Sequence, residues 1–143
     1  MAEGAIVITH DVNKAFFEQT LAAPRTVQPD TLAKSGKKAT VEGVKDKRVL
    51  SDDTRTIELY HIQGNMHNDG LLMAYLPKEK LLVQADVYNP PPPDTPPPAQ
   101  PNPAQVNLYE NIERLKLAVD QMLPLHGRIV PLSDLLKAIG KAS

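Results

Sequence analysis

The chain has 143 residues, a formal net charge of −1 and no cysteine. This length suffices for one hydrophobic core, so we expect a single domain over residues 1–143. The balanced charge offers nucleic acid no basic surface, and the lack of cysteine excludes disulfides, thiolate ligands and cysteine nucleophiles. We find no apolar run of the roughly 18 residues that a membrane span needs, and no signal peptide, and we therefore expect a soluble protein, cytoplasmic or periplasmic.

The N-terminal part of the sequence predicts a strand followed by a helix. The segment Ala5–Thr9 is short and rich in β-branched residues, which favours a buried strand. Asp11 is a plausible N-cap for a helix from Val12 to about Ala22, and Pro24 would end that helix. The following segment is less regular, with a short helix expected over 32–34 and short edge strands over 40–44 and 48–50.

The central part of the sequence predicts an antiparallel hairpin. Residues 54–62 alternate polar and apolar side chains, which is typical of a strand with one covered face. After a loop over Gly64–Gly70, two apolar runs at 71–76 and 81–85 are joined by a polar turn. Asp86 would then lie directly after the second strand of the hairpin.

Proline dominates the segment that follows. Residues 90–103 hold nine of the fourteen prolines, so we expect an extended loop outside any sheet. This loop is either a stiff surface connector, or a wall or partner surface beside a functional site. Further elements complete the chain: a helix over 106–122, a short strand at 129–130, and a last helix over 134–139 capped by Ser133 and closed by Gly140.

Three residues lie where a predicted strand gives way to a loop: His67, Asp86 and His126. Strand ends in one sheet can bring distant residues together, and two imidazoles with a carboxylate form a ligand set that suits zinc or iron. A simpler interpretation stays open, because single histidines commonly make structural hydrogen bonds and an aspartate after a strand commonly caps a turn. We expect this structural role for His10 and His61.

The order and spacing of these residues resemble the metallo-β-lactamase superfamily of metallohydrolases. The similar features are a Gly-x-x-His-x-Asp loop at Gly64–Asp69, Tyr75-x-Pro77 at the hairpin turn, the apolar strand before Asp86, and Leu125-His126-Gly127. Residues Asn65–Gly70 resemble a branch of environmental bacterial members of unassigned substrate. The resemblance implies an α/β (α+β) fold: half of an αβ/βα sandwich, with a mostly antiparallel or mixed sheet and helices packed on one face.

The resemblance also implies roles for the three residues. His67 would be the third histidine of a first metal site, Asp86 the carboxylate that bridges both metals, and His126 the terminal histidine of a second site. The family's reaction is attack by a metal-activated hydroxide on an ester, thioester, amide or phosphoester. The His-x-His-x-Asp-His motif, which supplies two ligands to each metal in this family, does not occur in the sequence. The chain therefore resembles only the C-terminal half of the fold.

These observations lead to one expected function and two alternatives. We expect a half-domain that carries part of a dinuclear zinc site, is inactive alone, and hydrolyses an ester, lactone or amide only when an N-terminal half or a partner completes it. The alternatives are a non-catalytic binding or oligomerisation domain derived from that fold, and an inactive remnant. An apolar surface left by a missing half would drive association, so we expect a homo-oligomer or a complex with a complementary N-terminal half. We expect no nucleic-acid or membrane partner.

Overall fold

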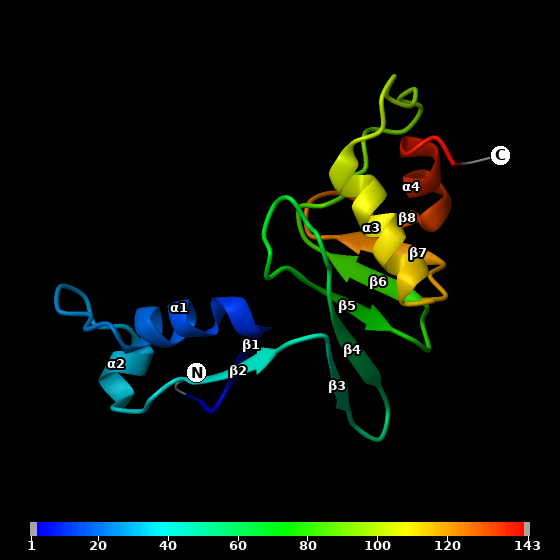
Figure 1. Ribbon diagram of the computed structural model, residues 1–143. Coiled ribbons are helices and arrows are strands. Elements are labelled where there is room, and N and C mark those ends of the chain that lie inside the picture. The colour runs from blue at the N-terminus through cyan, green and yellow to red at the C-terminus, as the bar shows by residue number, and fades with distance from the viewer. Residues whose placement is uncertain (1–2, 142–143) are drawn as a thin grey trace. The chain divides into compact units, whose positions relative to one another are not determined.

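The computed structural model describes residues 3–141, and the chain divides into two compact units, Met1–Asp46 and Lys47–Ser143 (Figure 1). Both units combine strands with helices, so the predicted α/β (α+β) class is confirmed. The single domain over residues 1–143 stays a prediction, because two compact units can still belong to one domain. Within the described residues, no helix is long and apolar enough to cross a membrane.

The first unit is a two-stranded parallel sheet with two helices. Strand β1 (Ile6–His10) pairs with β2 (Thr40–Val44), and α1 (Asp11–Ala22) and α2 (Thr31–Ser35) lie between them in the chain. The predicted strand and helix are confirmed, but β1 is not buried as expected, since Ile6 is 49% exposed. The predicted N-cap is also wrong. His10, and not Asp11, caps α1, because His10 keeps an extended backbone and its Nδ1 accepts a hydrogen bond from the Val12 N–H at 3.3 Å.

The second unit is built on a six-stranded mixed sheet in the order β3-β4-β5-β6-β7-β8. Neighbouring strands are antiparallel except for β6 and β7, which are parallel. The predicted hairpin is confirmed as β5 and β6, and β3 lies at the sheet edge as expected. The strands are β3 (Lys47–Ser51), β4 (Thr56–His61), β5 (Leu72–Leu76), β6 (Leu81–Gln84), β7 (Gln121–Pro124) and β8 (Val130–Pro131).

Two helices, α3 (Pro103–Arg114) and α4 (Leu132–Ala138), cover one face of this sheet (Figure 1). Alternate side chains of the strands point toward them and form the main hydrophobic core. Each large apolar side chain buried in this way contributes about 1.5–3 kcal/mol to stability. The core includes Tyr60, Met73, Tyr75, Leu82 and Met122 from the strands, with Leu108, Ile112 and Leu135 from the helices.

The prediction for the C-terminal part of the sequence is wrong in two places. The helix expected over 106–122 ends at Arg114, and Met122 lies in β7, where it pairs with Leu82 and Val130. The chain leaves the helix at Lys116, whose φ of 53° is left-handed. The apolar spacing of three and four residues continues past this point to Met122, but Met122 is buried as part of strand β7 and not of a helix.

The last helix also begins differently from the prediction. It starts at Leu132 and not at Asp134, and no side chain caps its N-terminus, so the assignment of Ser133 as the cap is wrong. Gly140, with a left-handed φ of 72°, follows the helix as expected. The predicted loop over the Pro-rich segment is confirmed for residues 90–102, and Pro103 begins α3, where proline's missing N–H leaves no hydrogen bond unmade.

Candidate metal site

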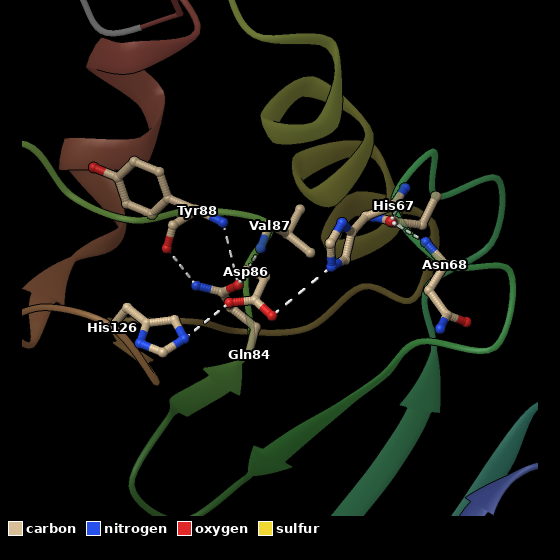
Figure 2. A network of polar contacts seen from close by, with 8 residues as sticks. His67, Asn68, Gln84, Asp86, Val87, Tyr88 and His126 are labelled. Carbon is tan, nitrogen blue, oxygen red and sulfur yellow. Dashed lines mark hydrogen bonds and ion pairs between the residues drawn. The ribbon is translucent and has the colours of Figure 1, made fainter.

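His67, Asp86 and His126 lie close together at one edge of the sheet in the second unit (Figure 2). The strand directions explain this convergence. Since β4, β6 and β7 run in the same direction, their C-terminal ends lie at the same edge. The three residues follow these three ends in turn. Sequence reasoning therefore predicted correctly that the three residues meet, while their role as metal ligands stays a prediction.

The carboxylate of Asp86 lies between the two imidazole rings. Its Oδ2 is 3.8 Å from Nε2 of His67, and its Oδ1 is 3.1 Å from Nε2 of His126. Each carboxylate oxygen thus faces a different imidazole nitrogen. Both rings direct the same nitrogen, Nε2, toward the carboxylate (Figure 2).

Asparagine side chains shape the loop that carries His67. Asn65, which is buried, accepts hydrogen bonds through its Oδ1 from the backbone N–H of His67 at 2.8 Å and of Asn68 at 3.3 Å. Asn68 in turn accepts from the N–H of Gly70 at 2.7 Å. Such asparagine turns fix a short loop without regular secondary structure. His61 is hydrogen-bonded to the backbone oxygen of Asp69 at 2.7 Å, in line with the structural role expected for it.

The loop that carries His126 is fixed by its neighbours in the sheet and in the Pro-rich segment. The Leu125 N–H donates to the Gln84 carbonyl at 3.0 Å, which continues the pairing of β6 and β7. Gly127 has a φ of 122°, and a Cβ at this position would meet Pro90 Cδ at 3.3 Å. The Arg128 side chain donates to the Pro91 carbonyl. The start of the Pro-rich loop therefore lies beside the candidate site. This position favours the interpretation that the loop forms a wall of the site over the interpretation that it is only a surface connector.

The three side chains are accessible to solvent. His67 is 59% exposed, Asp86 42% and His126 70%. Exposed ion pairs contribute only about 0–1 kcal/mol, so these contacts alone do little to hold the loops together. The three side chains therefore meet without stabilising the fold appreciably.

The donor chemistry fits a metal, but the ligand set is incomplete. Imidazole nitrogens and carboxylate oxygens are donors that zinc and iron both accept. Zinc sites in proteins usually have four ligands, of which three come from the protein in catalytic sites. Among the side chains of residues 3–141, no group of three or more His, Cys, Asp and Glu is arranged so that it could hold a metal ion. Any complete site therefore needs further donors.

Sequence reasoning missed one residue of this region, Gln84. Its side chain is hydrogen-bonded to the backbone of Val87 and Tyr88, which directly follow Asp86 (Figure 2). A signal for it was present in the sequence. In the run Leu81-Leu82-Val83-Gln84, the glutamine falls on the same face as Leu82, so a polar side chain occupies a position that alternation assigns to the core.

No protein-family model matches the sequence, and no curated protein is similar to it. Solved structures do match. A metallo-β-lactamase from Pontibacter korlensis superposes with a TM-score of 0.58 at 16% identity, over 97% of this chain and 58% of that one. The archaeal metallo-β-lactamase superfamily protein ST1585 from Sulfolobus tokodaii gives 0.60 at 15%, over 96% and 57%. A mutant flavo di-iron protein from Thermotoga maritima gives 0.60 at 16%, over 94% and 35%.

At these identities the likeness establishes the fold. The chain has part of the metallo-β-lactamase fold, as the resemblance of its sequence implied. It spans a little more than half the length of the two metallo-β-lactamase superfamily proteins and about a third of the flavo di-iron protein.

Proposed function

We propose that this chain contributes His67, Asp86 and His126 to the dinuclear zinc site of a metallo-β-lactamase-fold metallohydrolase. The observation that carries the proposal is the position of Asp86, whose two carboxylate oxygens each face the Nε2 of a different histidine. In a dinuclear site Asp86 would supply its carboxylate to both metal ions, and His67 and His126 would each supply an imidazole. The donor types suit zinc.

The three residues of this chain would bind the metal ions, and they would need further ligands from elsewhere to do so. His67 and His126 would each offer Nε2 as a metal ligand, and Asp86 would be a ligand common to the two metal sites. The chemistry that two metal ions supply is a lowered water pKa and stabilisation of the charge that develops on oxygen. Because three donors cannot fill two coordination shells, we propose that a complementary N-terminal half or a partner supplies the missing ligands. Hydrolysis of an ester, lactone or amide would then depend on that partner.

The identity of the metal is the next question for this site. The similar solved structures include both metallo-β-lactamases and a flavo di-iron protein. Oxygen and nitrogen donors without thiolate suit zinc and iron alike, so the donor set does not separate them. We propose zinc and treat iron as the competing outcome, which parallel titrations with zinc and with ferrous iron distinguish.

A second feature that supports a partner is the second face of the six-stranded sheet. The register places Leu59, Ala74, Val83 and Leu123 in one row across four strands, on the face opposite α3 and α4. These side chains are only partly buried. A solvated face of an antiparallel sheet is usually polar, whereas this face is mostly aliphatic, with Arg48, His61 and Gln121 as polar exceptions. Five further aliphatic side chains share it: Leu50, Ile57, Leu72, Leu76 and Leu81.

The same face favours a second candidate function. An aliphatic sheet face is suited to association with another protein layer, whether or not a metal is bound. The alternative is therefore a non-catalytic binding or oligomerisation domain, in which a second copy of the chain covers this face.

A zinc and activity measurement on the isolated chain tests the proposed function. The chain is freed of metal with a chelator, loaded with zinc, and assayed by plasma emission and against ester, lactone and lactam substrates. We expect weak zinc binding without turnover, and turnover only after a completing partner is added. Tight, stoichiometric zinc with turnover in the isolated monomer would refute the dependence on a partner.

A further inference from the structure

Gln84 is a polar residue in a core position. It is the last residue of β6 and is 2% exposed, and Leu82, two residues earlier on the same face, belongs to the main hydrophobic core. Burying an amide without hydrogen-bond partners costs several kcal/mol, depending on the reference state. A glutamine here therefore needs partners, and the identity of those partners indicates what it does.

All hydrogen bonds recorded for the Gln84 amide go to the backbone just beyond Asp86. Its Oε1 accepts from the N–H of Val87 at 3.1 Å and of Tyr88 at 3.2 Å, and its Nε2 donates to the Tyr88 carbonyl at 2.6 Å (Figure 2). Val87 and Tyr88 are themselves buried in the core. The side-chain amide of Gln84 thus links the end of β6 to Val87 and Tyr88. These bonds close a turn that contains Asp86.

The backbone of Asp86 needs this support. Its φ of 64° is left-handed, a conformation that residues other than glycine adopt uncommonly, although aspartate tolerates it better than most. The Gln84 backbone contributes at the same place, because its carbonyl accepts from the Leu125 N–H at 3.0 Å, next to His126. One residue therefore contacts both the turn of Asp86 and the start of the loop that carries His126.

We propose that Gln84 is a positioning residue: it holds the Asp86 carboxylate between His67 and His126 and thereby sets the zinc affinity of this edge of the sheet. The inference rests on the proposed metal site and adds to it a residue that cannot bind metal itself. Residues that orient a metal ligand typically change metal affinity about 10- to 100-fold when they are replaced. A purely structural role would instead lower the stability of the fold without a specific effect on zinc.

Replacing Gln84 with a residue of the same length tests the positioning role. Gln84→Met keeps the volume and removes all three hydrogen bonds, so we expect zinc binding, measured by titration calorimetry, to weaken about 10- to 100-fold. The matched control is Leu108→Ala, which removes core packing from α3 but none of the hydrogen bonds of the Gln84 side chain. It should lower the melting temperature and leave zinc affinity unchanged. Unchanged zinc affinity in Gln84→Met, or an equal loss in both variants, would overturn the inference.

A second measurement uses the unaltered, metal-free chain and does not depend on the folding of a variant. Hydrogen exchange of the Tyr88 amide should be as slow as in the central strands, because the Gln84 side chain accepts from it. The Val87 amide is not diagnostic, since it also donates to the Ala85 carbonyl at 2.8 Å. Exchange as fast as in an open loop would contradict the positioning role. The two proposals can fail separately. If the unaltered chain binds no zinc, the proposed function fails, and amide exchange still decides whether Gln84 holds the turn of Asp86.

Discussion

Oδ1 of Asp86 and Nε2 of His126 lie 3.1 Å apart because the two residues follow paired positions of neighbouring strands, each by two residues. Gln84 at the end of β6 is paired with Pro124 at the end of the parallel strand β7. From these partners the two chains continue in the same direction, so residues two positions further along meet side by side. The contact between carboxylate and imidazole is thus a consequence of parallel pairing, although the Pro-rich loop and α3 separate the two residues in sequence.

The loop beyond His126 should tolerate no side chain at Gly127. Gly127→Ala forces an alanine into a φ of 122° and places its Cβ 3.3 Å from Pro90 Cδ. We expect a loss of about 2–3 kcal/mol in the free energy of unfolding, measured with urea. Gly140→Ala is the control, because its φ of 72° is left-handed and its Cβ meets no atom within 4 Å. It should cost about 1–2 kcal/mol. Equal losses in the two variants would show that Pro90 does not pack against this loop.

The assignment of Met122 to a strand in the core can be tested by truncation. Met122 is fully buried, so Met122→Ala should lower the free energy of unfolding by about 2–5 kcal/mol. Met66→Ala is the matched control, because Met66 is 79% exposed, and it should change stability by no more than about 0.5 kcal/mol. A change at Met122 as small as that at Met66 would contradict the position of β7 in the sheet.

The stability of the sheet edge should depend on pH through Glu58. Burial opposes its ionisation and is the largest single effect, but hydrogen bonds from Tyr60 at 2.5 Å and Lys47 at 2.9 Å together lower its pKa below the usual value. A lowered pKa means that this stabilisation is present above the ordinary glutamate pKa and is lost as pH falls through the lowered one.

Glu58→Gln should therefore remove a stability increment of about 0.5–1 kcal/mol at neutral pH, and the difference from the unaltered chain should shrink as the pH falls below the ordinary glutamate pKa. Urea unfolding across pH 3–7 measures this. Lys47→Met is the companion variant, because it removes one of the two donors and should reduce the same increment in part. A difference that stays constant over the whole pH range would exclude this role for Glu58.

The second face of the sheet should mediate association. If a second copy covers it, the unaltered chain forms a dimer or larger assembly in light scattering, and Val83→Glu makes it monomeric because a charge enters the aliphatic row. Val27→Glu is a matched control, since Val27 is 99% exposed in the first unit, and it should leave the assembly intact. A monodisperse monomer of the unaltered chain at high concentration, without added partner, would count against self-association.

Local patterns were sufficient for much of the fold. β-Branched residues marked β1, and two apolar runs around a polar turn marked the hairpin of β5 and β6. Both features depend on neighbours in the chain, which is why the sequence indicates them. The meeting of His67, Asp86 and His126 was also predictable, because each follows a strand end.

The errors arose where distant pairing decides the structure. Met122 continues the helical spacing of α3, and only its pairing with Leu82 and Val130 makes it part of a strand. The N-cap of α1 was missed for a local reason, since aspartate is the commoner cap and the His10 side chain makes the bond instead. Gln84 was missed because its partners lie in a turn whose shape the sequence does not specify.

Zinc titration of the metal-free chain tests the central claim most directly. Titration calorimetry on the unaltered chain is compared with His67→Ala, Asp86→Ala and His126→Ala, and with His10→Ala, which removes a histidine of the first unit and leaves the three residues intact. The account predicts zinc binding that each of the three substitutions abolishes or weakens at least about tenfold, and that His10→Ala leaves unchanged. Zinc affinity that is the same in all five proteins, or no zinc binding by the unaltered chain, would contradict it.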